Sequence, residues 1–347
     1  MIKNYLTSAW RYIVRNTFYS SINMLGLVIG MTIFLLLIQY VFHEYSYDDF
    51  LDKSDRIFRV QQDRYDKGEL STQWASGCAG IGPALDRNFE EVEDWVRLRK
   101  DNGILAYEDR IYRENDIFFA GSSFFRIFSI PLVKGVDSLV LKEPNTIVLS
   151  QSMARKYFGD EDPMGKILVG NGSLNLKVTG VFKDLPENTH MKFDALMSFA
   201  TFESFFRDPN ELNTWNWDAY MTYILLNKNT DPAAFEAKIP DMVEKEHGEE
   251  LRHSNHNVIF HLQPVRSIHL DSHYMFEFQQ NGSRSTTKYL AIIAILVLII
   301  AWINYINLST ARSIDRAREV GIRKVMGGIK QELIRQFLLE SAMVNLA

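Results

Sequence analysis

The uncharged stretch YLAIIAILVLIIAWINYINL, residues 289–308, decides the fold class of this 347-residue chain. At 1.5 Å per residue, a helix of about this length crosses a hydrocarbon core of about 30 Å. A second uncharged stretch, INMLGLVIGMTIFLLLIQYVF, occupies residues 22–42. The alternative is a buried core helix, but such a helix rarely stays uncharged on every face for so long. The sequence therefore predicts a membrane protein with two complete α-helical spans.

The charges beside the two spans predict their orientation. Lys3, Arg11 and Arg15 precede the first span, whereas the residues after it are acidic, beginning with Glu44. The second span is followed by a strongly basic segment that starts at Arg312. Because basic residues collect on the cytoplasmic side, both ends are expected in the cytoplasm and residues 43–288 outside it.

The segment between the spans is acidic and lacks a disulfide framework. Residues 1–42 and 309–347 each carry a net charge of +3, and the whole chain carries −5, so the part between them carries −11. This balance argues against a nucleic-acid partner. With Cys78 as the one cysteine, the outer segment has to fold around its own hydrophobic core.

The outer segment is expected to be a two-lobed α+β domain, with a lobe of about residues 118–206 inserted into a β-α-β frame. Alternating or short apolar runs predict strands at 57–64, 95–100, 174–182, 220–226 and 257–262. Helices are expected at 83–89, 151–158 and 232–245. Ser150 and Asp231 are the predicted caps of the last two helices, and Gly159 is the predicted end of the first of these.

The outer segment shows no convincing catalytic or metal-binding motif. GDEDPMGKI, residues 159–167, has five residues between its glycines and Ile167 after the lysine, which does not match a phosphate-binding loop. Six histidines lie between 247 and 273, and His253 and His256 are spaced to share a helix face. Without HExxH or a nearby cysteine, solvated histidines are the expected state. We therefore expect no catalytic residue and no metal site.

Two glycines in the first span have the spacing of a helix-packing motif. Gly26 and Gly30 are four residues apart, which lets another helix approach closely. The alternative is that glycine is simply frequent in membrane helices.

The sequence ARSIDRAREVGIRKVMGG, residues 311–328, predicts a short amphipathic helix directly after the second span. Glu319 and Arg323 are spaced as a favourable helical pair. Gly321 interrupts the helix, and Gly327 and Gly328 provide a reversal before a new apolar segment. One interpretation is a helix that docks on another protein. The other is a basic helix that lies on anionic lipid.

Four stretches resemble a known transporter family. NYINLSTARSIDRAREVGIRKVMGG (304–328), followed by LIRQFLLES (333–341), closely resembles the start of the FtsX-type permease domain of ABC transporters in the MacB/LolC/LolE group. NMLGLVIGMTIFLLLIQYV (23–41) resembles the first span of that group. LSQSMARKYFGDEDPMGKIL (149–168) and VTGVFKDLPENTHMKFD (178–194) resemble its extracytoplasmic core domain.

The resemblance implies a multi-pass permease of the bacterial inner membrane that acts as a dimer with a second copy or a paralogue. ATP and Mg²⁺ would be bound by a partner ABC ATPase, so this chain is expected to hold no cofactor. Membrane lipids and a periplasmic adaptor are further candidate partners. The residues that match the family's ATPase-coupling stretch are Arg318, Glu319, Val320, Gly321, Ile322, Arg323 and Lys324.

The resulting domain plan has six parts. They are an N-terminal amphipathic segment (1–20), the first span (21–42), a MacB-like core domain (43–288), the second span (289–308), a coupling helix (309–328) and the start of a third span (329–347). Because Ala347 falls inside that third span, the chain is expected to be a truncated fragment.

The expected function is that of a permease subunit rather than an enzyme. It would couple ATP hydrolysis in the partner to movement of the outer domain, for export or extraction of a peptide, lipoprotein or drug-like substrate. The alternative is a membrane-anchored sensor that signals through its cytoplasmic helix. The cargo does not follow from the sequence.

Overall fold

The computed structural model describes residues 17–208, 212–215, 217–254, 256–325 and 334. Contacts divide the chain into two compact units. The helical unit holds the described residues up to 42 and from 285 onwards, and the outer unit holds residues 43–284. The expected N-terminal segment 1–20 lies largely outside the described residues, as do Gly327, Gly328 and nearly all of the expected third span.

The helical unit consists of α2 (Thr17–Tyr45) and α10 (Arg284–Val325). Both are long and apolar enough to cross a membrane, over Leu25–Tyr45 and Arg284–Asn307. Only 11% of each apolar window is buried inside the molecule. A core helix of a soluble protein would be mostly buried, so the structure favours the membrane interpretation of these helices.

The helix α10 corrects the expected boundary between the second span and a separate coupling helix. It runs without a break from Arg284 to Val325, so residues 289–308 and 309–325 form one helix. No proline occurs after Pro264, and no glycine lies between Gly282 and Gly321, so nothing in this stretch stops a helix. Gly321 is helical as well: a glycine costs about 1 kcal/mol relative to alanine but does not end the helix.

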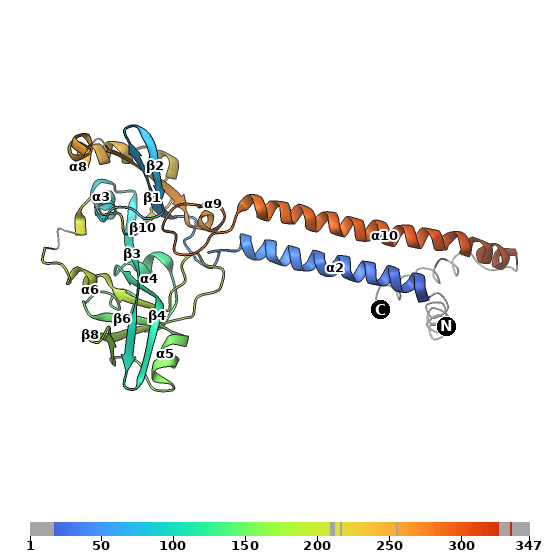
Figure 1. Ribbon diagram of the computed structural model, residues 1–347, viewed down its shortest axis with the longest axis horizontal. Coiled ribbons are helices and arrows are strands. Elements are labelled where there is room, and N and C mark those ends of the chain that lie inside the picture. The colour runs from blue at the N-terminus through green and yellow to red at the C-terminus, as the bar shows by residue number, and fades with distance from the viewer. Residues whose placement is uncertain (1–16, 209–211, 216, 255, 326–333, 335–347) are drawn as a thin grey trace. The chain divides into compact units, whose positions relative to one another are not determined.

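The outer unit is built on one mixed sheet of eleven strands (Figure 1). The strands run in the order β11-β1-β10-β3-β4-β9-β6-β8-β5, with β2 paired to β1 and β7 paired to β3 and β8. Their bounds are β1 Ile57–Asp66, β2 Glu69–Trp74, β3 Val92–Tyr107, β4 Arg110–Ala120, β5 Leu132–Lys134, β6 Thr146–Ser150, β7 Ile167–Gly170, β8 Leu174–Phe182, β9 Ala195–Ser198, β10 Met221–Leu226 and β11 His256–Pro264.

The sheet carries short helices and three hydrophobic clusters. The helices are α3 Ile81–Asn88, α4 Phe124–Phe128, α5 Gln151–Phe158, α6 Phe199–Glu203, α7 Pro232–Glu236, α8 Ile239–Ser254, the 3-10 helix η2 Val265–Ser267 and α9 Ile268–Asp271. One cluster packs α3, α7 and α8 against β1, β10 and β11. A second packs α5 and α6 against β4, β6 and β8. The third, rich in phenylalanine, joins both ends of the sheet.

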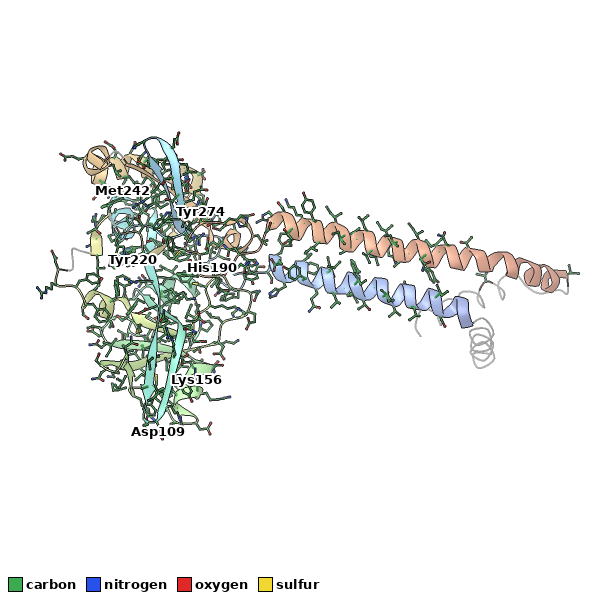
Figure 2. The ribbon with its side chains drawn as sticks, in the orientation of Figure 1. Asp109, Lys156, His190, Tyr220, Met242 and Tyr274 are labelled. Carbon is green, nitrogen blue, oxygen red and sulfur yellow. The ribbon has the colours of Figure 1, made fainter. Side chains whose placement is uncertain are left out.

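The expected inserted lobe of residues 118–206 contains β5 to β9 and α4 to α6, but it is not separated from the frame. Its sheet is continuous with the remainder through the long strands β3 and β4. Figure 2 shows the extent of the outer unit, with Asp109 at the far tip of the β3–β4 hairpin, Tyr220 in the middle and Met242 on α8.

Several local predictions are confirmed, and one helix is corrected. The Ser150 side chain caps α5 by accepting from the Met153 amide, and Asp231 caps α7 by accepting from the Ala233 amide. The helix expected over 232–245 is instead two helices, because Pro240 has no amide proton and clashes with the carbonyl four residues earlier. That carbonyl belongs to Glu236, where α7 ends.

Candidate functional site

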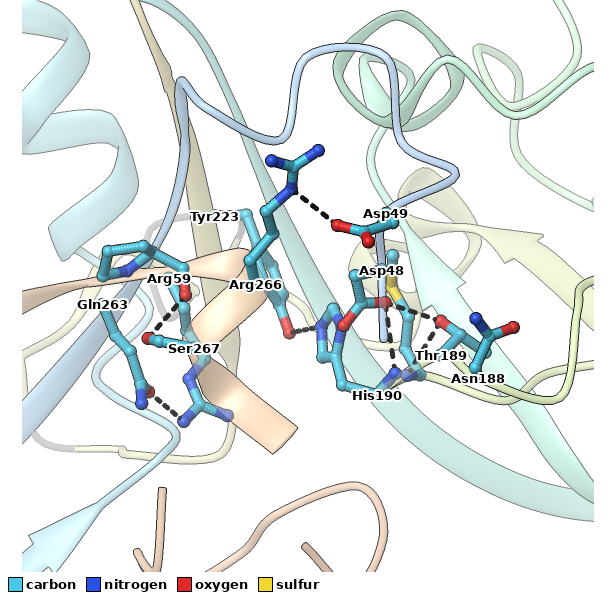
Figure 3. A network of polar contacts seen from close by, with 12 residues as sticks. Asp48, Asp49, Arg59, Asn188, Thr189, His190, Tyr223, Gln263, Arg266 and Ser267 are labelled. Carbon is cyan, nitrogen blue, oxygen red and sulfur yellow. Dashed lines mark hydrogen bonds and ion pairs between the residues drawn. The ribbon is translucent and has the colours of Figure 1, made fainter. Parts of the chain in front are cut away.

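The candidate site is a buried polar network at the points where the chain enters and leaves the outer unit. Figure 3 shows part of this network, with Asp48, Arg59, Thr189, His190, Tyr223 and Gln263 labelled. One part of the network lies in the residues that follow α2, and another part lies in the residues that precede α10. The strands β1 and β10, which are neighbours in the sheet, connect the two parts. We call the following residues the base network: Asp48, Arg59, Thr189, His190, Tyr223, Gln263, Ser272 and Glu277.

Asp48 fastens the segment after α2 to the rest of the outer unit. It is fully buried, and its carboxylate accepts from Thr189 Oγ1 at 2.9 Å and from the His190 amide at 3.2 Å. The same carboxylate lies 2.8 Å from His190 Nδ1, and His190 Nε2 lies 2.8 Å from the Tyr223 hydroxyl. Because a carboxylate only accepts, Nδ1 is assigned as the donor, and the Tyr223 hydroxyl then donates to Nε2.

Arg59, which is on β1, holds the segment before α10 against the sheet. Its side chain is fully buried and holds both oxygens of Glu277, at 2.6 and 2.8 Å. The same guanidinium donates to Gln263 Oε1 at 2.5 Å and to Ser272 Oγ at 2.8 Å. Such a forked, multiply bonded arrangement compensates the cost of burying the two charges.

The two halves of the base network meet inside the sheet. Arg59 of β1 and Tyr223 of β10 are direct cross-strand partners. Burial raises the pKa of Tyr223, and the positive charge of Arg59 beside it opposes that rise. The polar contacts therefore form one path, Asp48–His190–Tyr223–Arg59–Glu277, from the segment after α2 to the segment before α10.

A second link joins the same two segments. Glu44 lies 3.0 Å from His269 Nε2, and the His269 ring stacks on Tyr47 with centroids 3.3 Å apart. Burial lowers the pKa of His269, and the Glu44 carboxylate partly offsets this shift. Gly282 lies so close that a Cβ there would come within 2.5 Å of Glu44. A side chain at this position would therefore displace the ends of the Glu44 and His269 side chains.

The base network suits a mechanical role better than a chemical one. Asp48, Arg59 and His190 are each at most 3% exposed, so substrate has no access to them. Burial also raises the pKa of the Cys78 thiol to about 12, which leaves it protonated and unreactive. Among the described residues, no group of three or more metal-ligating side chains comes together.

The histidines singled out from the sequence serve separate contacts. His247 stacks on Trp215, His261 lies beside Glu236, and His269 belongs to the second link. His253 is on α8 and His256 on β11, so the expectation that they share a helix face is wrong.

The two glycines of the first span lie against α10. A Cβ on Gly30 would stand 2.6 Å from the Cβ of Ala301, and one on Gly26 would stand 2.8 Å from Asn304 Nδ2. Ala294 and Ala301, seven residues apart on α10, are both buried. Small residues therefore line the close approach of the two helices.

The predicted coupling residues lie in the last turns of α10, and Gly321 is exposed. No described atom comes within 4 Å of a Cβ built on Gly321. The side chains of the other coupling residues are outside the described part of the chain. These are Arg318, Glu319, Val320, Ile322, Arg323 and Lys324.

Sequence reasoning missed every member of the base network. One signal was available: Arg59 stands in the middle of the apolar strand sequence IFRV, where an unpaired charge would be costly. Its partner Glu277 lies 218 residues further along, and spacing alone does not identify it.

Comparisons with known proteins agree with this architecture. The model of the MacB-like periplasmic core domain matches residues 20–242. An export ATP-binding/permease protein of Pseudomonas fluorescens is 28% identical over 64% of this chain and 32% of its own length. The syringafactin export ATP-binding/permease protein SyfD of Pseudomonas syringae is 25% identical over 65% of this chain and 31% of its own length.

A solved domain of a permease protein from Porphyromonas gingivalis has the same fold. It is 24% identical, has a TM-score of 0.54, and the match covers 62% of this chain and 91% of that one. The present chain spans about a third of the length of the two curated relatives. The family model, in contrast, matches well over half of this chain. The chain therefore belongs to the MacB-like periplasmic core domain family, as its resemblance to the MacB group predicted.

Proposed function

We propose that this protein is the permease subunit of an ABC transporter in the bacterial inner membrane, with its outer unit on the extracytoplasmic side. ATP hydrolysis in a partner ATPase moves the outer unit, and this movement exports or extracts a peptide, lipoprotein or drug-like substrate. Membership of the family and the export ATP-binding/permease names of its relatives support the general assignment. The coupling to movement is our own inference.

The observation that carries the proposal is the continuous base network. A helix displacement moves a neighbouring domain only if the connecting segments are stiff, because a flexible loop absorbs the motion. Here the segment after α2 is held through Asp48 and the segment before α10 through Glu277, both against adjacent strands of one sheet. Motion of either helix is thus passed to the sheet.

The length of α10 supports contact with a cytoplasmic partner. Its 42 residues extend about 63 Å at 1.5 Å per residue, roughly twice the hydrocarbon core of a bilayer. The apolar window ends at Asn307, so the stretch from there to Val325 continues beyond it. We propose that residues 318–324 on this extension contact the ATPase, which supplies the bound ATP and Mg²⁺.

The remaining partners follow from the same proposal. A second permease copy or a paralogue completes the transporter, membrane lipids surround α2 and α10, and a periplasmic adaptor is a candidate for the outer unit. No role for nucleic acid is proposed.

Affinity purification of the natural full-length protein from gently solubilised membranes tests the proposal. We expect a soluble subunit with a phosphate-binding loop to co-purify. Glu319→Lys or Arg323→Glu should release it, whereas the outer-unit control Glu187→Lys, at a side chain that is 84% exposed, should retain it. Retention of the ATPase by both coupling variants would contradict the contact. Absence of any ATPase from the folded protein would favour the sensor alternative.

A further inference from the structure

A cleft in the outer unit opens at the N-terminal end of β10, the strand that lies between β1 and β3 in the sheet. At the N-terminal end of β10, the pairing with β1 ends at Thr222, which lies opposite Val60. The pairing with β3 ends at Met221, which lies opposite Leu98. Beyond these pairs, β1 and β3 continue with no shared neighbour between them. A cavity of about 610 Å³ lies there. Its lining includes Arg64, Trp74, Arg99, Trp217, Asp218 and Phe276.

The cleft contains a cation that has no acidic partner among the described residues. Arg64 pairs with Asp218, and Lys100 pairs with Asp116 at 2.9 Å. Arg99 instead lies over the rings of Phe202 and Trp217, at 4.5 and 5.0 Å from their centroids. A guanidinium that is held over aromatic rings can still use its N–H groups to bind a carboxylate.

Buried polar atoms in the cleft wall also lack hydrogen-bond partners within the described chain. They are Asp218 Oδ1, which accepts, and Trp74 Nε1 and Arg64 Nε, which donate. The Asp218 side chain is only 3% exposed. These atoms lie beneath the surface of the wall, so the cleft combines exposed aromatic faces with a polar wall behind them.

The apolar part of the lining is exposed and aromatic. Phe276 is 59% exposed and Trp217 is 37% exposed. The Phe276 ring packs on Trp74 with centroids 4.7 Å apart, and its backbone has φ of +66°. This conformation is strained for a bulky residue, and such strain tends to occur where a side chain is held in place for a ligand.

We propose that this cleft binds a short peptide segment in which a large apolar or aromatic side chain stands next to a carboxylate. Arg99 takes the carboxylate, and Trp74, Trp217 and Phe276 take the apolar side chain. This inference adds a binding site and a class of ligand to the proposed function. It rests on the proposed function only for the claim that the bound peptide is then exported or extracted.

The cleft shares a segment with the base network. Phe276, Glu277 and Phe278 line the cleft, while the Glu277 carboxylate is held by Arg59. The same segment is fastened to β2, because the Met275 amide donates to the Gln73 carbonyl at 3.0 Å. A peptide in the cleft therefore contacts the segment that leads into α10.

Calorimetric titration of the full-length protein in lipid nanodiscs tests the site. The probe is acetyl-Ala-Phe-Leu-Phe with a free carboxylate, and the comparison ligand is its C-terminal amide. We expect the amide to bind wild type at least tenfold more weakly, because it loses the charge-assisted hydrogen bond to Arg99. The variant Arg99→Ala should bind both peptides equally and weakly, and Arg99→Lys should recover part of the discrimination.

The matched control is Arg113→Ala, at an exposed arginine on β4 outside the cleft lining. It should bind the carboxylate peptide as wild type does. The cleft assignment is wrong if wild type binds neither peptide, if it binds acid and amide equally, or if Arg99→Ala keeps the discrimination while melting like wild type. Any of these results leaves the ATPase purification unaffected, so the two proposals fail separately.

Discussion

At the scale of single residues, the outer unit depends on polar groups that are buried and hydrogen-bonded to one another. Asp48, His190 and Arg59 would each be costly to bury alone; both ring nitrogens of His190, the Asp48 carboxylate and the two terminal nitrogens of Arg59 have partners. Breaking such a set by removing one partner is much more harmful than removing a surface charge.

The variant His190→Ala tests this network directly. It leaves the Asp48 carboxylate buried without its Nδ1 partner and the Tyr223 hydroxyl without an acceptor. We expect the free energy of unfolding to fall by about 3 kcal/mol, as judged by chemical denaturation of the outer-unit signal. Lys53→Ala, at an exposed contact to the Arg126 carbonyl, serves as the control and should change it by less than about 1 kcal/mol. Equal effects of the two variants would contradict the role given to His190.

The lowered pKa of His269 predicts a pH dependence. Because burial holds the folded-state pKa below the ordinary 6.5, the unfolded chain binds a proton more readily than the folded one as pH falls. The stability contributed by neutral His269 is thus complete above pH 6.5 and is lost progressively below it. Denaturant midpoints at pH 7.5 and 5.5 should differ more for wild type than for His269→Gln. An unchanged difference in the variant would assign the pH dependence to other groups.

At the scale of elements, the close packing of α2 on α10 depends on small side chains. Within a bilayer, helices gain little from the hydrophobic effect and associate through close packing. The contact of Gly30 with Ala301 is the tightest such approach described in the helical unit.

The pair Gly30 and Ala301 allows a compensating test. Gly30→Ala would place two Cβ atoms 2.6 Å apart, and the resulting shift should lower stability by about 1–2 kcal/mol. Adding Ala301→Gly removes the clash, so the double variant should melt above the Gly30→Ala single variant in nanodiscs. Gly321→Ala, which meets no described atom, should be neutral or slightly stabilising. If the double variant melts below both single variants, the packing role is refuted.

The elements that the sequence predicted well are those with local signals. Ser150, Gly159 and Asp231 mark helix ends by their own chemistry, and β8 alternates between more exposed and more buried residues over most of its length, before its last three residues, which are all buried. The strands β6 and β9 were missed because every residue in them is buried, so their short apolar runs have no alternation. Pro240 was the overlooked sign that α7 and α8 are separate helices.

At the scale of the whole molecule, one sheet connects the points where the chain enters and leaves the outer unit. The composition and the span pattern predicted the membrane class and the outer domain. They did not predict the base network, whose contacts join residues up to 218 positions apart. The cleft also depends on where β10 ends relative to β1 and β3, which is a matter of register between distant strands.

The most direct test of the central claim is hydrogen–deuterium exchange of the full-length permease with its partner ATPase in lipid nanodiscs, with ATP, with ADP and without nucleotide. We predict that ATP changes the amide exchange of residues 43–51 and 265–284, the two segments held by the base network, and that ADP does not. Exchange in the outer unit that is identical in all three states, while the ATPase hydrolyses ATP, would contradict the claim that the permease transmits the ATPase cycle across the membrane.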